Sequence, residues 1–317
     1  MDLMADIGAT NTRCALVDDR GEELAAEVFH NADFAGLPIL LKSYLEHRRQ
    51  TDRPKRAALA VAAPIVGDEV QMLNIEWQFS QADLKTELGL NEIIVCNDFA
   101  AIAWGLPYFG SADLHTVGGG QRVAGAALAT LGPGSGLGVG ALVPAADGWA
   151  VVTGEGGHST LPATTREEAD VIAQIRDRYD GHCSAERVLS GPGIVNLYVA
   201  LAELAGRGPA APVAPADVTT LAKQGDPLAL KAQAMFFAFL GMVAGDLALT
   251  TGARGGVFIA GGIVPQLLEA LDKSEFRARF EAKGRYKSYL AAIPTHVITD
   301  PLPAFRGLRH LLGYRVL

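Results

Sequence analysis

Two short segments rich in glycine and hydroxyl residues have the residue types that bind phosphate. The first comprises Asp6, Ile7, Gly8, Ala9, Thr10 and Asn11, and the second contains Gly132, Gly134, Ser135 and Gly136. Small residues let backbone N–H groups approach an anion closely, and hydroxyl groups add donors. Each segment stands between two short apolar runs, a pattern typical of a β-hairpin. Two such hairpin tips predict two related lobes that hold one polyphosphate.

Two common nucleotide-binding motifs explain these segments less well. A Walker A loop ends in Gly-Lys followed by Ser or Thr, and the sequence contains no Gly-Lys pair. The run from Gly136 to Ala141 matches a loose dinucleotide-binding fingerprint, which must open a helix, but a strand-like Ala-Leu-Val-Pro follows here. A glycine-rich turn that binds nothing is the alternative for either segment taken alone.

Several polar residues could hold the hydroxyl groups of a polyol. They are Asn97, Asp98, Glu155, His158 and Glu186. Asn97 and Asp98 follow an apolar run and start a predicted helix, and ligands in α/β proteins gather at such strand ends. Carboxylates form charge-assisted hydrogen bonds to hydroxyls, each worth about 1.5–3 kcal/mol. The set therefore predicts a sugar site.

Each of these residues also has a simpler interpretation. Asp98 could only cap its helix, Glu155 and His158 could lie in an exposed turn, and Glu186 could be a solvated surface acid. A glycosidase could use two of the carboxylates, but it would have no use for two phosphate-binding segments.

Composition restricts the class of protein. The 317 residues suggest about two domains. The net charge of −8 argues against non-specific binding to nucleic acid or to anionic membranes. Cys14, Cys96 and Cys183 are far apart, which predicts reduced thiols, a cytoplasmic protein and no structural zinc. The longest apolar run, 234–245, is too short to span a bilayer and predicts a buried helix.

The predicted elements form a repeated pattern. In each half of the chain, strands come first as a meander and then alternate with helices, which indicates a duplicated α/β fold. Thr164 and Glu167 predict a capped helix that runs to Tyr179. The turn Gly191-Pro192-Gly193 predicts a helix that follows it, from Ile194 to Leu204. Asp226 and Pro227 predict the start of a long helix ending near residue 250.

Taken together, the motifs resemble those of the bacterial glucokinase family, within the actin–Hsp70–sugar-kinase superfold, over essentially the whole chain. The first segment is similar to the family's Asp-x-Gly-Gly-Thr-Asn motif, with Ala9 in place of the second glycine. Asn97 and Asp98 are similar to its Asn-Asp-Phe motif, in which the aspartate is the catalytic base. The second segment is similar to its Gly-x-Gly-Thr-Gly-Leu-Gly motif, with Ser135 in place of threonine.

Further motifs follow in the family's order. The segments 155–158 and 186–193 resemble its sugar-binding stretches, and 259–263 resembles its adenosine motif. Two departures stand out. The segment 301–307 lacks the expected Gly-Leu-x-Gly run, and Cys183 stands alone where the related repressor/kinase family has a cysteine-rich zinc motif.

The resemblance implies a specific enzyme, which phosphorylates glucose at the 6-hydroxyl with ATP and Mg²⁺. It would have two lobes of a duplicated ribonuclease-H-like (actin-like ATPase) fold with a cleft between them. The small lobe would comprise residues 1–108 plus 301–317, and the large lobe residues 109–300. Asp98 would be the catalytic base. The sugar would contact Asn97, Asp98, Glu155, His158, Glu186, Ser135 and Gly136. ATP would contact Asp6, Ile7, Gly8, Ala9, Thr10, Asn11, Gly132, Gly134, Ser135, Gly261 and Gly262.

The resemblance assigns no side chain as a direct metal ligand, although Asp6 could hold Mg²⁺ through water. It also implies a cytoplasmic homodimer that binds neither nucleic acid nor a membrane. Two alternatives stay open: a kinase for another hexose or an amino sugar, and a non-enzymatic ATP-binding regulator on the same fold.

Overall fold

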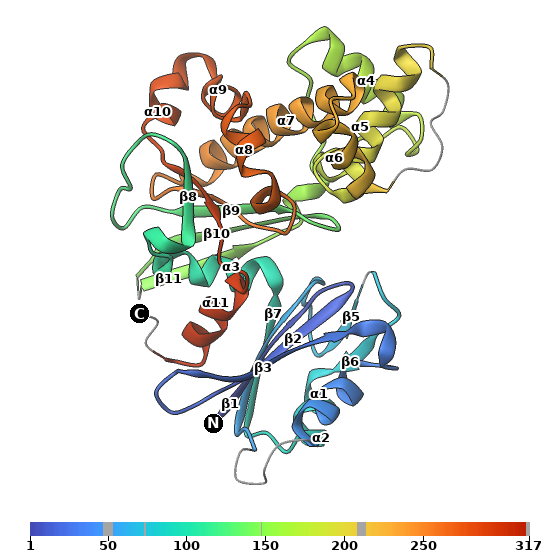
Figure 1. Cartoon of the computed structure of the whole chain (residues 1–317). Helices are drawn as coiled ribbons and strands as arrows, with labels where there is room; N and C mark the ends of the chain where they lie inside the picture. The colour runs from blue at the N-terminus through green and yellow to red at the C-terminus, as the bar shows by residue number, and fades with distance from the viewer. Residues whose placement is uncertain (47–52, 73, 147, 208–213, 315–317) are drawn as a thin grey trace. The chain divides into compact units, whose positions relative to one another are not determined.

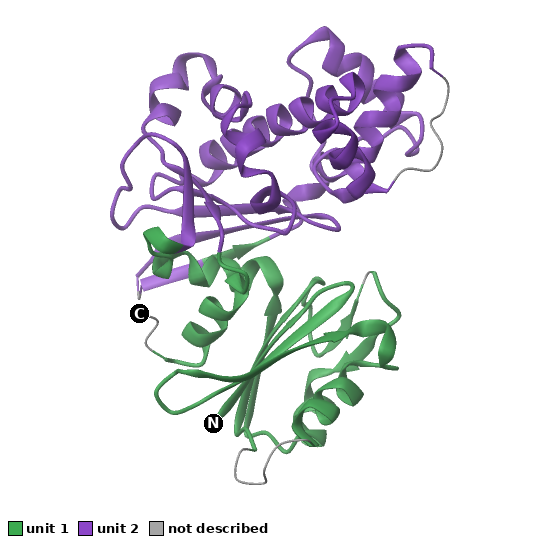
Figure 2. Cartoon of the chain, viewed as in Figure 1, with its two compact units in different colours: residues 1–112, 151–153, 300–317 green, residues 113–150, 154–299 purple. Residues whose placement is uncertain are grey.

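The computed structural model describes residues 1–46, 53–72, 74–146, 148–207 and 214–314. The chain divides into two compact units (Figure 2). Unit 1 comprises Met1–Ala112, Val151–Thr153 and Asp300–Leu317, and unit 2 comprises Asp113–Ala150 and Gly154–Thr299. Unit 1 is therefore built from both ends of the chain, with a short middle segment.

Unit 1 contains a five-stranded sheet in the order β3-β2-β1-β4-β7 (Figure 1). Its strands are β1 (Asp2–Ile7), β2 (Asn11–Val17), β3 (Glu23–His30), β4 (Arg56–Val61) and β7 (Glu92–Asn97). β1 pairs antiparallel with β2 and parallel with β4. The first predicted hairpin is confirmed. A small ribbon of β5 (Glu69–Gln71) and β6 (Gln78–Ser80) stands apart from this sheet.

Four helices cover the two faces of the unit 1 sheet. They are α1 (Leu37–Glu46), α2 (Gln81–Glu87), α3 (Asp98–Gly105) and α11 (Pro303–Leu311). α1 and α2 lie on one face, and α3 and α11 pack against each other on the other (Figure 1). The first pair packs over an apolar core that includes Leu3, Ile7 and Leu59. The segment 301–307 thus leads into a helix that packs in unit 1, although it lacks the glycine run of the family motif.

Unit 2 contains a six-stranded sheet in the order β11-β10-β9-β12-β13-β8. Its strands are β8 (Leu114–Gly118), β9 (Leu128–Pro133), β10 (Leu137–Ala145), β11 (Gly148–Thr153), β12 (Val257–Ile259) and β13 (Thr295–Ile298). β9 pairs antiparallel with β10 and parallel with β12, so the first five strands repeat the order of the unit 1 sheet. The predicted duplication and the second hairpin are both confirmed.

The helices of unit 2 surround one long central helix, α7 (Pro227–Thr251). The others are α4 (Arg166–Arg176), α5 (Gly191–Leu204), α6 (Pro215–Lys223), α8 (Leu268–Asp272), α9 (Phe276–Glu281) and α10 (Lys287–Ala291). Asp226 caps α7 by accepting hydrogen bonds from Leu228 N and Ala229 N, as the sequence predicts. By length and composition α7 could cross a membrane, so the argument from the short apolar run 234–245 does not hold. Of the residues in its most apolar stretch, 61% are buried inside the protein, in agreement with the predicted buried helix.

Two helix starts differ from the prediction. α4 is capped by Thr165 with Glu168, one residue later than predicted for Thr164 and Glu167. The reason is that the Glu168 carboxylate also accepts hydrogen bonds from the backbone N–H and hydroxyl of Thr164. α5 begins at Gly191 rather than after the Gly-Pro-Gly turn, because Ser190 caps it by accepting from Gly193 N.

Candidate functional site

The first phosphate-like segment is the turn between β1 and β2. Gly8 N–H donates to Asn11 O at 3.0 Å and closes the turn. The buried side chain of Asn31 supports it from below, because Asn31 Nδ2 donates to Gly8 O at 2.8 Å and Asn31 Oδ1 accepts from the Thr12 hydroxyl at 2.8 Å. Sequence patterns did not identify Asn31, since its role depends on contacts with residues about twenty positions away.

Ala9 and Asp6 also have defined roles in this turn. Ala9 has a negative φ, because the positive-φ residues other than glycine are Ala25 and Asp180 in the described chain. The backbone therefore does not require the family's second glycine at this position. Asp6 stands near the end of β1 and forms an ion pair with Arg13 at 3.6 Å. Burial raises the pKa of the Asp6 carboxyl, and the charge of Arg13 opposes that shift.

Asn97 and Asp98 stand where β7 passes into α3. Asn97, rather than Asp98, is the N-cap residue: its Oδ1 accepts from Phe99 N at 2.9 Å and from Ala100 N at 3.2 Å. Its Nδ2 donates to Ala63 O at 3.3 Å. Asn97 therefore uses both ends of its amide within unit 1, and Asp98 occupies the first helical position. A carboxylate is favoured there by the partial positive charge of the helix N-terminus.

The second phosphate-like segment is the turn between β9 and β10, which we call loop 2 (residues 132–137). Gly134 N–H donates to Gly136 O at 2.8 Å across the turn. Gly261 of the predicted adenosine motif lies against the backbone at the start of loop 2, at Gly132 and Pro133. Gly261 has φ +82°, and a Cβ there would lie 2.4 Å from Pro133 O, so only glycine fits. Ser135 is exposed at the tip.

Two of the predicted sugar ligands lie beside loop 2. Glu186, in a short 3₁₀ turn (Ala185–Arg187), accepts a hydrogen bond through Oε2 from Leu137 N at 2.9 Å. His158 Nε2 lies 4.0 Å from the same oxygen. Glu155 and His158 bracket another 3₁₀ turn, in which His158 N donates to Glu155 O at 3.0 Å. Unit 2 thus brings the predicted sugar residues and a phosphate-like loop together, as transfer of a phosphoryl group to a sugar would require.

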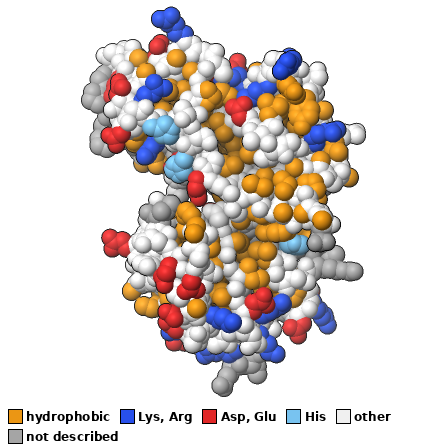
Figure 3. All heavy atoms as spheres, turned by 180° about the vertical axis from the view of Figure 1, so that it is seen from behind, with side chains coloured by type: hydrophobic (Ala, Val, Ile, Leu, Met, Phe, Trp, Pro, Cys, Tyr) orange, Lys and Arg blue, Asp and Glu red, His pale blue; other side chains and the backbone are white. Residues whose placement is uncertain are grey.

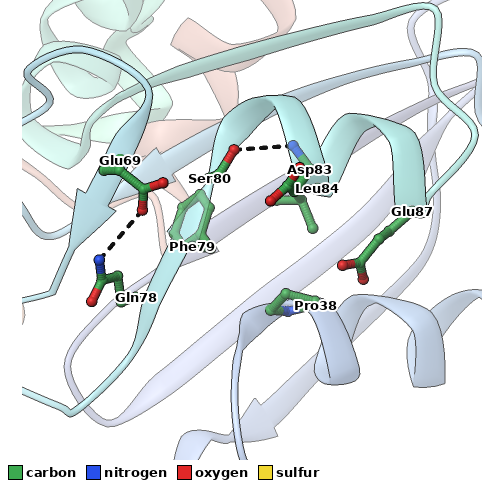
Figure 4. Close-up of a pocket in the computed structure, with 8 residues that line it drawn as sticks. All are labelled: Pro38, Glu69, Gln78, Phe79, Ser80, Asp83, Leu84 and Glu87. Atoms are coloured by element: carbon green, nitrogen blue, oxygen red, sulfur yellow. Dashed lines mark hydrogen bonds between the residues drawn. The ribbon is translucent and has the colours of Figure 1, made fainter.

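Unit 1 contains a pocket (Figure 4). It opens between the β5–β6 ribbon and the helices α1 and α2, and its lining includes Glu69, Asp83 and Glu87. Three carboxylates would repel a polyphosphate. None of the residues predicted to bind sugar or nucleotide lines this pocket.

The described part of the chain contains no group of three or more His, Cys, Asp or Glu side chains placed to hold a metal ion. Cys14 and Cys183 are buried, and burial raises the pKa of the Cys183 thiol to about 11. The expectation that the chain carries no zinc stays a prediction, and elemental analysis of protein purified without added metal can test it.

Comparison with known proteins gives a consistent result. The glucokinase family model matches residues 3–314. Glucokinase from Paramagnetospirillum magneticum is 47% identical over 314 residues, covering 98% of this chain and 97% of that protein. The crystal structure of a glucokinase from an Antarctic psychrotroph is 36% identical, with a TM-score of 0.86 and 98% of both chains covered.

A more distant structure extends the comparison of folds. A ROK family glucokinase from Streptomyces griseus, solved in complex with glucose and AMPPNP, is 18% identical, with a TM-score of 0.65 and 98% of both chains covered. At that identity the likeness concerns the mixed α/β fold alone. The family model and the close relatives confirm the resemblance noted in the sequence: the chain belongs to the glucokinase family, the enzymes that phosphorylate glucose with ATP.

Proposed function

We propose that this chain transfers the γ-phosphoryl group of ATP to the 6-hydroxyl of glucose with Asp98 as the base. The sugar oxygen forms a bond to the γ-phosphorus, the bond from that phosphorus to the bridging oxygen breaks, and ADP leaves. Asp98 accepts the hydroxyl proton. A carboxylate is a weak base for an alcohol, so the proton moves late, as the new bond to phosphorus draws charge from the oxygen.

The observation that carries this proposal is the group formed by Glu186, His158 and loop 2. A carboxylate and an imidazole suited to sugar hydroxyls lie next to a turn with a glycine and hydroxyl tip. In the proposal, Glu155, His158 and Glu186 hold the sugar, the tips of both hairpins hold phosphate oxygens, and Gly261 and Gly262 lie against the adenosine. Because Asp98 belongs to unit 1 and Glu186 to unit 2, both units would act as lobes around one glucose molecule.

The residues of unit 1 also fit a magnesium ion. Asp6 offers a carboxylate near the end of β1, close in sequence to the phosphate-binding tip. Asp6 would hold the ion through a water molecule, since Mg²⁺ usually keeps several waters. When bound, Mg²⁺ offsets the negative charge of the β- and γ-phosphates. The cytoplasmic location and the homodimer stay predictions from the sequence.

Charge on the molecular surface favours a small-molecule substrate over nucleic acid. On the face seen in Figure 3, basic side chains are interspersed with acidic ones among the described residues. A broad basic patch, the usual feature of a nucleic-acid surface, is not seen on that face.

The role of Asp98 can be tested with the Asp98→Asn variant in an assay that couples ADP release to a colour change. Loss of a general base should lower kcat by at least about 10²-fold, while the affinity for ATP is retained. Asp83→Asn is the matched control, because Asp83 is also an acid in the first turn of a unit 1 helix. Near wild-type turnover by Asp98→Asn would show that Asp98 is not the base.

A further inference from the structure

The segment that carries Glu186 holds loop 2 at two points. Leu137 N–H donates to Glu186 Oε2 at 2.9 Å, and Gly191 N–H donates to Gly134 O at 2.8 Å. The segment is itself fixed, because the Ser190 hydroxyl donates to Glu186 O at 2.8 Å. Residues 186–191 and loop 2 are therefore connected by hydrogen bonds at both ends of the turn, although about fifty positions separate them in sequence.

Gly136 occupies the space next to the Glu186 carboxylate. A Cβ on Gly136 would lie 2.4 Å from Oε2 and 3.2 Å from the carboxyl carbon of Glu186. Gly134, two residues earlier in the same loop, has no atom within 4 Å of its Cβ position. The two glycines thus have different reasons to be small: the space beside Gly134 is open, and the space beside Gly136 is filled by the carboxylate.

We propose that Gly136 is a positioning residue for the sugar, because the shape of loop 2 at that point fixes the carboxylate of Glu186. The inference rests on the proposed function, in which Glu186 is a sugar ligand. Oε2 is held by Leu137 N–H, and Oε1 accepts no hydrogen bond from a described residue. Oε1 is therefore the oxygen that can accept a hydrogen bond from a sugar hydroxyl. The position of loop 2 determines the position of the carboxylate through the bond from Leu137 N–H to Oε2.

The same contact couples the two substrates. A hydroxyl bound to Oε1 favours the carboxylate position in which Oε2 holds Leu137 N–H, and that bond orders the end of loop 2. Nucleotide phosphates bound by loop 2 favour the same arrangement. Each ligand should then strengthen the binding of the other by the same factor, because coupling between two sites is reciprocal.

Calorimetric titration of glucose, with and without the hydrolysis-resistant analogue AMPPNP, tests both statements. For the wild type, the glucose Kd should fall at least about fivefold when AMPPNP is present, the low end of common coupling. In Gly136→Ala the carboxylate must swing away, so a sugar hydroxyl loses a charge-assisted hydrogen bond worth about 2 kcal/mol. Its glucose Kd without nucleotide should rise about 30-fold, and the effect of AMPPNP on that Kd should disappear.

Gly119→Ala is the matched control, since it adds the same methyl group to unit 2 at a position with no atom within 4 Å of the Cβ. Its glucose Kd without nucleotide should equal that of the wild type. The obstacle in Gly136→Ala is the tip of a flexible side chain, so the variant should fold, with a melting temperature lowered only by the loss of the hydrogen bond between Leu137 N–H and Glu186. An unchanged glucose Kd in folded Gly136→Ala would overturn the inference.

Two variants of Glu186 separate failure of the inference from failure of the proposed function. Glu186→Asp keeps the charge but is one methylene shorter, so it should lose the coupling as Gly136→Ala does. Glu186→Ala should weaken glucose binding by about 30-fold if Glu186 is a sugar ligand at all. Wild-type glucose affinity in Glu186→Ala would contradict the proposed site. Weakened affinity in Glu186→Ala together with wild-type coupling in Glu186→Asp would contradict only the inference.

Discussion

Asn31 is the residue on which the first phosphate-binding turn depends. Its side chain donates to Gly8 O and accepts from the Thr12 hydroxyl, and its backbone N–H donates to Thr10 O at 2.9 Å. A single amide thus connects both sides of the turn. In a buried position such bonds matter because the partners cannot replace them with water.

We expect Asn31→Ala to loosen this turn and to affect ATP more than glucose. The change leaves the Gly8 carbonyl and the Thr12 hydroxyl without that partner, which should lower the free energy of unfolding by about 1–3 kcal/mol. Steady-state kinetics should show a raised KM for ATP and a smaller change in KM for glucose. Asn91→Ala, at an exposed position of unit 1, serves as the control. A raised glucose KM with wild-type ATP KM would contradict this role.

The limits of sequence interpretation are visible at single residues. Thr164 with Glu167 and Thr165 with Glu168 fit the capping pattern equally well. The structure selects Thr165, because Glu168 also receives the N–H and hydroxyl of Thr164 and pairs with Arg279 at 2.6 Å. Arg279 is more than a hundred positions away, so no local pattern could decide between the two. The role of Asn31 and the contact between Glu186 and Leu137 could not be predicted from local sequence patterns for the same reason.

At the scale of elements, α3 and α11 approach each other closely at two glycines. A Cβ on Gly307 would lie 1.8 Å from Ala101 O, and one on Gly105 would lie 3.2 Å from Arg306 Cβ. The obstacle at Gly307 is backbone, which cannot rotate away. α11 therefore fixes the position of α3, the helix whose first residue is Asp98.

Gly307→Ala should separate the two helices. Overpacking of this kind costs about 1–3 kcal/mol or more, and because α3 would shift, kcat should fall while KM for ATP stays near the wild-type value. Gly105→Ala faces a milder contact and should cause smaller changes of the same kind. Thermal melting and steady-state kinetics of the two variants would show whether Gly307→Ala has the larger effect. If Gly307→Ala were as stable as the wild type, the prediction would be wrong.

The same helix pair contains a histidine that should make stability depend on pH. The Tyr108 hydroxyl lies 2.9 Å from His310 Nδ1, and the Trp104 ring stacks on the imidazole with centroids 5.0 Å apart. Burial lowers the pKa of His310. The folded state therefore binds this proton less readily than the unfolded state, so the stabilisation is present above the ordinary pKa of about 6.5 and is lost as the pH falls below it.

The expected result is a pH-dependent difference between the wild type and His310→Gln. The difference in melting temperature should be larger at pH 7.5 than at pH 5.5, because only the wild type must protonate a partly buried imidazole. Burial also lowers the pKa of His296 in unit 2, so the comparison must be between the two proteins and not between two pH values of one. A difference that is the same at both pH values would show that His310 does not titrate in this range.

Hydrophobic patterns and turn residues predicted most of the elements correctly. Both hairpins, the strand before Asn97 and the long helix after Asp226 were evident, because each depends on neighbours in sequence. Which elements pack against one another was harder to predict from the sequence. The segment 301–307 lacks the family's glycine run, yet its one glycine, Gly307, stands where α11 approaches α3 closely.

At the scale of the whole molecule, the predicted sugar ligands come from both units, Asp98 from unit 1 and Glu155 and Glu186 from unit 2. A glucose molecule contacted by all three should bind best when the units are close, and should shift the population toward that state. X-ray scattering in solution should then show a smaller radius of gyration with saturating glucose than without it. ATP alone should have a smaller effect. Identical profiles for a protein shown to bind glucose would favour a sugar site confined to one unit.

The return of the chain to unit 1 at Asp300 has a consequence for biosynthesis. A ribosome makes α3 early and α11 only after the whole of unit 2. During most of translation, the surface of α3 that packs against α11, which includes Gly105, therefore has no partner helix. Both parts of unit 2, Asp113–Ala150 and Gly154–Thr299, precede α11 in the chain, so unit 2 can fold once residue 299 has emerged. The nascent chain should therefore acquire its second phosphate loop before Asp98 is held in place, and substitutions in α11 should be those that most increase dependence on chaperones.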